Sequence, residues 1–298
     1  MAEDLLRIEG LKCHFGSNKA VNDVTLSLRQ GEVLGLVGES GSGKSTLGRC
    51  VMGLQPLTGG KIWLRNQCIR MPGKPSLAMR RANREGALQM QMVFQDPMAS
   101  LDPRMTVRES IAEGLIIQGI RDRAFLRRKV EEMLELVGLP KSYADRYPHE
   151  FSGGQRQRIG IARALVMQPK LLIADEPVSA LDVSVQAQVI NLMQDLRQAL
   201  GLSVLFIAHD LSVVKYFCDR IAVMRLGRLV ELASAEELFR HPLHPYTKSL
   251  LSAMPVPDPR VQRQRRRIVY TPTPPEHAVW QQLRPDHWVL HSNALTDI

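Results

Sequence analysis

Cysteine is scarce in this chain of 298 residues. The four cysteines, Cys13, Cys50, Cys68 and Cys218, form no C-x-x-C pair, so their spacing indicates no redox dithiol. Unpaired thiols are typical of proteins that remain in a reducing compartment such as the cytosol. We therefore expect these cysteines to be structural and to have no redox function.

Long hydrophobic runs are also missing. No stretch approaches 18 consecutive apolar residues, the length at which a transmembrane helix is predicted. The opening segment MAEDLLRIEG is acidic and lacks the basic residues and apolar core of a signal peptide. The sequence therefore predicts a soluble chain without a membrane span.

Basic residues are in excess, but the aromatic residues that would accompany them at a nucleic-acid site are not. The formal net charge is +9, and the densest basic run covers residues 260–267, with a smaller cluster at Arg80, Arg81 and Arg84. Basic runs in such linkers are typically solvated or lie near anionic lipid. Because aromatic and basic residues do not alternate as they do where bases stack, no nucleic-acid partner is expected.

Apolar residues are plentiful, at 44% of the chain, and the length suits one large α/β domain plus a tail. Three motifs directly follow or end apolar runs that predict buried strands: GESGSGKST (38–46), LLIADEP (171–177) and LFIAHD (205–210). In a parallel sheet, ligands bind beyond the carboxyl ends of the strands. We therefore expect Lys44, Asp175, Glu176 and His209 to converge on one edge, where ATP would be bound and cleaved.

The first motif fits the pattern G-x-x-x-x-G-K-[ST] of a phosphate-binding loop, called the P-loop below. Glycines allow backbone N–H groups to wrap the phosphates, and the following helix points its positive end at them. Lys44 is expected to contact the β- and γ-phosphates, and Ser45 to bind Mg²⁺. A flexible Gly/Ser-rich turn would not explain the preceding strand VLGLV (33–37). The expected nucleotide-binding residues are Gly38, Glu39, Ser40, Gly41, Ser42, Gly43, Lys44, Ser45 and Thr46.

The second motif places two carboxylates at the end of an apolar run. Two adjacent acids there are costly unless a cation binds them. Asp175 suits a Mg²⁺-associated role, and Glu176 suits a general base that activates water. The alternatives are a solvated acidic turn for this pair and, for His209, an ordinary packed or surface imidazole.

The segment FSGGQRQRIGIARAL (151–165), called the signature segment below, distinguishes this chain from a general P-loop protein. Its Ser-Gly-Gly opens a helix and so predicts a second anion-binding helix start. A plain glycine-started helix is the alternative. With this segment the chain resembles the ATP-binding-cassette (ABC) ATPases, whose motifs occur in the same order.

The resemblance implies roles for further residues. Phe15 would stack on adenine, and Gln95 in MVFQDP would contribute to catalysis and the Mg²⁺ site. Ser152, Gly153, Gly154 and Gln155 would complete the site of a partner cassette. Asp182 would contact the nucleotide from the loop of residues 179–182 that follows Glu176. The implied cofactors are ATP and Mg²⁺.

Four further segments are similar to the peptide and nickel importer subfamily, and most similar to the F-type ATPase of oligopeptide and dipeptide permeases. They are DPMASLDPR (96–104), RYPHEFSGGQ (146–155), DEPVSALDVSVQAQV (175–189) and HPLHPYTKSLLSAMPVPDP (241–259). This similarity implies a peripheral ATPase on the cytoplasmic face of the inner membrane. Its partners would be two membrane-spanning permease subunits, a second ATPase or another copy, and indirectly an extracytoplasmic binding protein.

The transported solute stays open at this point among dipeptides, oligopeptides, nickel, glutathione and opines. A soluble ABC-type switch acting on ribosomes or nucleic acid is the alternative. However, the two cassettes or long coiled coils of such relatives are missing. A P-loop kinase would leave the signature segment and Gln95 unexplained.

The expected fold is α/β: an ABC nucleotide-binding domain with a RecA-like parallel-sheet core, an antiparallel β subdomain and a helical arm. The antiparallel part covers residues 5–29 and 61–69, and the helical arm covers residues 103–147, or to about 167 with the signature helix. Residues 221–232 predict a hairpin around Gly227. We expect a cassette at 1–255 and a C-terminal tail at 256–298.

The tail lacks the cysteines that hold an iron–sulfur cluster in many F-type relatives, since no cysteine follows Cys218. A cluster is therefore not expected. The spacing of His277, His287 and His291 matches no recognised metal-ligand pattern. We expect an extended tail packed on the cassette.

Overall fold

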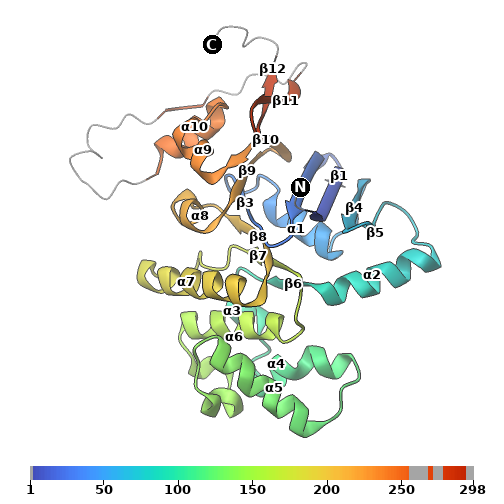
Figure 1. Cartoon of the computed structure of the whole chain (residues 1–298), viewed down its shortest axis with the longest axis vertical. Coiled ribbons are helices and arrows are strands. Elements are labelled where there is room, and N and C mark those ends of the chain that lie inside the picture. Colours follow the sequence, from blue (N-terminus) through green and yellow to red (C-terminus); the bar gives the residue numbers. More distant parts are fainter. Residues whose placement is uncertain (1–2, 255–267, 271–277, 293–298) are drawn as a thin grey trace.

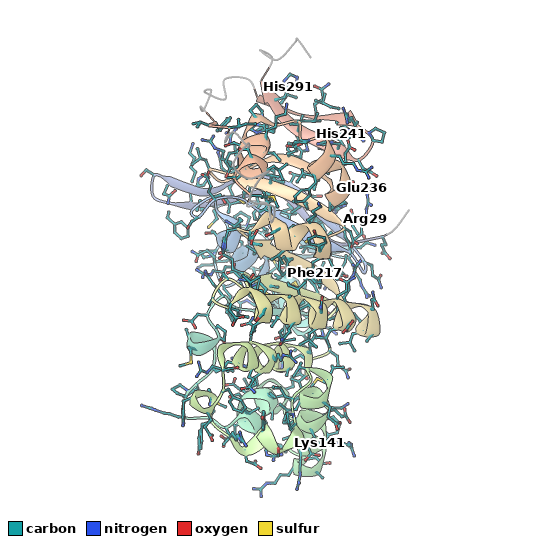
Figure 2. All side chains as sticks on the ribbon, turned by 90° about the vertical axis from the view of Figure 1, so that its left-hand side faces the viewer. Arg29, Lys141, Phe217, Glu236, His241 and His291 are labelled. Atoms are coloured by element: carbon teal, nitrogen blue, oxygen red, sulfur yellow. The ribbon has the colours of Figure 1, made fainter. Side chains whose placement is uncertain are left out.

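The structure, a computed structural model, describes residues 3–254, 268–270 and 278–292. The helices α4, α5 and α6 gather at one end of the molecule, and the strands β11 and β12 lie at the other (Figure 1). Lys141 and His291 mark these two ends along the long axis (Figure 2). The described strands form two sheets, one of four strands and one of eight that includes β11 and β12.

The larger sheet has a parallel centre. In spatial order these strands are β9 (Arg220–Arg225), β3 (Val33–Val37), β8 (Ser203–Ala208), β7 (Leu171–Asp175) and β6 (Met90–Val93). Every residue of β3, β7 and β8 is buried, because both faces of a parallel sheet are covered. The carboxyl ends of these three strands therefore lie at one edge, as the motifs predict.

The smaller sheet is antiparallel and confirms the expected β subdomain. Its strands, in order, are β2 (Asn18–Arg29), β1 (Asp4–Phe15), β4 (Gly59–Leu64) and β5 (Gln67–Arg70). Helix α1 (Lys44–Met52) contributes Leu47, Cys50 and Val51 to a core that it shares with strands of both sheets. The P-loop helix is thereby fixed between the two sheets.

The helical arm is confirmed. It contains α4 (Val107–Ile117), α5 (Arg123–Leu136), two 3-10 turns (Lys141–Asp145 and Pro148–Glu150) and α6 (Gly153–Leu165), and the short helix α3 (Pro97–Ser100) precedes its predicted start. Val130, Leu134 and Val137 recur at helical spacing and are fully buried in its core. The other helices flank the sheets: α2 (Leu77–Gln89), α7 (Val183–Leu200), α8 (Leu211–Phe217), α9 (Ala235–Arg240) and α10 (Pro245–Ser252).

Helix α2 was not predicted from the sequence. The sequence analysis noted only a basic cluster in this segment, at Arg80, Arg81 and Arg84. The only buried residues of α2 are the small Ala82 and Gly86, so few large apolar side chains mark this segment as part of the core.

The described part of the tail packs on the cassette as expected, but it does so as a β hairpin that the sequence did not predict. The strands β11 (Ala278–Arg284) and β12 (His287–Ser292) form a hairpin. Strand β12 pairs with β10 (Arg228–Ser234), the second strand of the confirmed hairpin around Gly227. The edge of β10 offers unpaired backbone groups that a further strand can satisfy. His277 lies outside the described residues, and the boundary at residues 255 and 256 stays a prediction.

Candidate active site

The P-loop connects the end of β3 to the start of α1. Gly43, directly before α1, has a φ of 104°, and a Cβ on it would lie 2.0 Å from the carbonyl oxygen of Ala20. Only glycine fits this left-handed position and close approach. The loop can therefore turn sharply and present the N-terminus of α1 to a ligand.

Lys44 is buried beneath the P-loop. Its Nζ donates to the carbonyl oxygens of Gly38 and Glu39, each at 2.8 Å. Burial lowers the pKa of Lys44, while the carboxylates of Glu176, Asp175 and Glu39 oppose that shift. The ammonium group is thus held at the loop by acceptors that the chain itself supplies.

Asp175 is the last residue of β7, and its Oδ1 accepts a hydrogen bond from the Ser45 hydroxyl at 2.7 Å. The carboxyl is buried, which raises its pKa, and the bond from Ser45 opposes that shift. Hydroxyl and carboxylate oxygens are ligands that Mg²⁺ prefers. This donor pair therefore fits a magnesium ion beside bound phosphates.

Glu176 has different hydrogen-bond partners from Asp175. Its φ is 47°, a left-handed conformation that is unusual for a residue other than glycine and is typical of strained functional positions. Its Oε2 accepts a hydrogen bond from Gln95 Nε2 at 3.0 Å and lies 3.0 Å from His209 Nδ1. The structure thus brings together Gln95, Glu176 and His209 from three strand ends.

These side chains face a cavity of about 580 Å³. Phe15, at the end of β1, is 47% exposed at this cavity. The cavity is lined by Phe15, Asn18, Ala20, Ser40, Gly41, Gly43, Lys44, Ser45, Thr46, Gln95, Glu176 and His209. Sequence analysis missed Asn18 and Ala20, because only the placement of β2 beside the P-loop brings them there.

The signature segment lies apart from this cavity, since none of its residues lines it. Ser152 caps α6 by accepting a hydrogen bond from the Gln155 backbone N–H at 3.3 Å. Ser152 and Gly153 are exposed, whereas Gly154 is buried against Val185. Asp182 is likewise exposed and caps α7.

Comparison with known proteins decides the family. The ABC transporter family profile matches residues 21–179, more than half of the chain. The chain belongs to the ABC transporter family. It is accordingly an ATP-binding ATPase, and the profile of the oligopeptide/dipeptide transporter C-terminal region also matches residues 230–278.

Relatives within this family cover nearly the whole chain. It is 53% identical to the oligopeptide transport ATP-binding protein OppF of Bacillus subtilis, over 99% of this chain and 98% of that protein. It is 50% identical to the dipeptide transport ATP-binding protein DppF of Lactococcus lactis, over 95% and 91%. These similarities favour an importer ATPase over a switch acting on ribosomes or nucleic acid.

Solved structures of ABC ATPases share the fold. The cbiO1 protein of Clostridium perfringens, part of the ABC transporter complex cbiONQ, is 26% identical with a TM-score of 0.72, over 88% of this chain and 98% of that one. The ADP form of MJ1267, an ATP-binding cassette of an ABC transporter, is 27% identical with a TM-score of 0.66, over 80% and 96%. Within the described residues, no helix has the length and apolarity that crossing a membrane requires.

Proposed function

We propose that this chain is the ATP-hydrolysing subunit of a peptide importer and acts at the cytoplasmic face of the inner membrane. Lys44, Ser45 and Glu176 line one cavity, and Asp175 is hydrogen-bonded to Ser45 behind it; this arrangement carries the assignment of the hydrolytic site. The peptide class is supported by the C-terminal region matched at residues 230–278 and by the names of the relatives.

In the proposed mechanism, the P-loop backbone from Gly38 to Thr46 binds the phosphates of ATP, and Phe15 stacks on adenine. Lys44 exchanges its contacts with the loop carbonyls for the β- and γ-phosphates. Ser45 and Asp175, with Gln95, would hold Mg²⁺, which neutralises charge on the phosphates.

Glu176 then accepts a proton from the attacking water. Its carboxylate is oriented by Gln95 and His209, each at 3.0 Å from Oε2. The phosphate transfer itself needs positioning and charge stabilisation more than covalent chemistry from the protein. Lys44 and the P-loop amides supply that stabilisation.

The site of one chain is incomplete without a second cassette. Ser152 and Gly153 are exposed and lie outside the cavity of their own chain. We propose that they, with Gly154, Gln155 and the exposed Asp182, face ATP bound to a partner cassette. The partner is a second ATPase subunit or another copy of this chain.

A groove beside the site offers a place for the membrane subunits. It has a volume of about 190 Å³ and includes Leu54, Phe94 and Arg163. Leu54 and Phe94 are exposed apolar residues, and Phe94 directly precedes Gln95, whose amide contacts Glu176. We propose that a cytoplasmic segment of a permease subunit docks here, where its movement would reach the catalytic carboxylate.

Peptide uptake tests the proposed function. In a strain from which other peptide importers have been removed, deleting the coding sequence is expected to abolish uptake of labelled di- and oligopeptides. Restoring the chain should restore uptake. Nickel uptake in the same cells is the control, and loss of nickel uptake with peptide uptake intact would contradict the peptide assignment.

A further inference from the structure

A tyrosine of the C-terminal region contacts the P-loop. Tyr246 lies in α10 and is 2% exposed. Its hydroxyl oxygen accepts a hydrogen bond from the backbone N–H of Glu39 at 3.1 Å. On the other side of that residue, Lys44 donates to the Glu39 carbonyl oxygen at 2.8 Å. The first variable residue of the P-loop is thus fixed from two sides.

The ring of Tyr246 is held by its neighbours. The guanidinium carbon of Arg225 lies 5.2 Å from its centroid, and the Tyr270 ring packs edge-on with centroids 5.7 Å apart. Such cation–π and aromatic contacts restrict the ring in addition to burial. The hydroxyl therefore has little freedom to leave Glu39.

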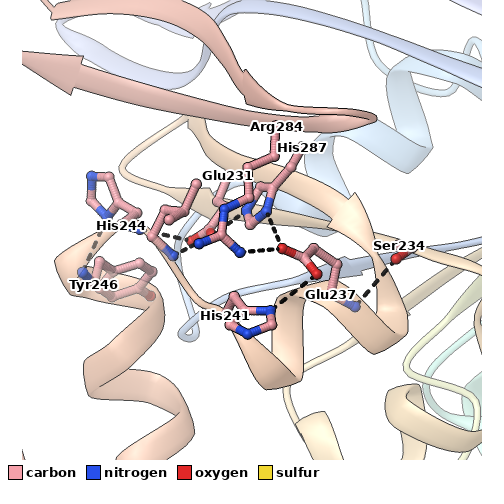
Figure 3. A network of polar contacts seen from close by, with 9 residues as sticks. Glu231, Ser234, Glu237, His241, His244, Tyr246, Arg284 and His287 are labelled. Carbon is pink, nitrogen blue, oxygen red and sulfur yellow. Dashed lines mark hydrogen bonds and ion pairs between the residues drawn. The ribbon is translucent and has the colours of Figure 1, made fainter. Parts of the chain in front are cut away.

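The start of α10 is itself anchored to the sheet and the tail hairpin (Figure 3). The Glu231 carboxylate accepts hydrogen bonds from the backbone N–H groups of Leu243 at 2.7 Å and His244 at 3.1 Å. His287 Nε2 of β12 lies 2.7 Å from the same carboxylate, and both side chains are fully buried. His244 Nδ1 then accepts from the Tyr246 N–H at 3.1 Å. Consecutive contacts therefore connect the tail hairpin to the P-loop.

We propose that Tyr246 is a positioning residue that pre-orders the P-loop for the phosphates of the nucleotide. A loop that is already ordered binds more tightly, because the ligand does not have to supply the ordering free energy. This inference rests on the P-loop cavity being the nucleotide site. It gives the C-terminal region a part in nucleotide binding, although none of the described residues of that region lines the cavity.

Tyr246→Phe tests the inference, because it removes the hydroxyl and keeps the ring. The dissociation constants for MgATP and MgADP are expected to rise about two- to tenfold, the effect of one neutral hydrogen bond. Tyr270→Phe is the matched control. It removes a hydroxyl from the adjacent ring, and that hydroxyl makes no hydrogen bond to any described residue. Affinities are measured by equilibrium binding and thermal stability by calorimetry.

The outcomes distinguish a role of Tyr246 in ordering the P-loop for nucleotide from a role in the stability of the fold alone. A lower melting temperature of Tyr246→Phe with unchanged nucleotide affinity would overturn the inference, as would an equal effect in Tyr270→Phe. If the wild-type chain and Lys44→Ala bind MgATP equally well, the site assignment fails, and this inference fails with it. If only Lys44→Ala loses affinity, the site stands and Tyr246 has no positioning role.

Discussion

Glu176→Gln is expected to lower ATP turnover by about 100-fold or more, the range of general acid–base contributions, while MgATP remains bound. Glutamine keeps the size of the side chain and can still contact Gln95 and His209, which lie 3.0 Å from the carboxylate oxygen. It cannot accept the proton of the attacking water. The rate of phosphate release at saturating ATP measures the loss of turnover, and equilibrium binding of MgATP measures whether affinity is retained.

Glu85→Gln is the matched control for that experiment. Glu85 undergoes the same chemical change but lies on α2, in an exposed ion pair with Arg81, where it should leave turnover at the wild-type rate. Turnover of Glu176→Gln within threefold of wild type would remove Glu176 from the role of general base.

Lys44→Ala is expected to abolish turnover and to weaken MgATP binding by about 100-fold, the upper effect of one charge-assisted hydrogen bond. Lys44 is the only cationic side chain in the P-loop. Its loss also leaves the carbonyl oxygens of Gly38 and Glu39 without their buried donor. Equilibrium binding measures the affinity for MgATP, phosphate release measures turnover, and calorimetry establishes that the variant is folded.

Lys74→Ala provides the control, because it removes an exposed lysine outside the cavity. Lys44→Ala that folds, binds MgATP as tightly as wild type and turns it over would contradict the assignment of Lys44 to the phosphates.

Sequence alone predicted much of the site, because its residues follow buried strands immediately. The apolar runs before Gly38, Glu176 and His209 end where β3, β7 and β8 end. Since parallel strands present their carboxyl ends at the same edge, convergence follows from the order of motifs. The Ser45–Asp175 and Glu176–His209 hydrogen-bond contacts in the structure show this convergence directly.

Features that depend on contacts between distant parts of the chain could not be predicted from the sequence. The contact between Tyr246 and Glu39 joins residues 207 positions apart, and no local pattern encodes it. Strand β12 is defined by its pairing with β10 through Glu231 and Leu232. A short alternating segment does not itself specify which sheet edge it will join.

We propose that the ATP site of this cassette is completed by a second cassette. Bound ATP favours association only through contacts made across the interface. Sedimentation velocity of Glu176→Gln with and without MgATP tests this most directly, using the purified chain and a mixture with its companion ATPase subunit. ATP is predicted to drive pairing, and adding Ser152→Arg should block it while ATP stays bound to the P-loop. A chain that stays monomeric with ATP in both settings, and is unaffected by Ser152→Arg, would contradict the account.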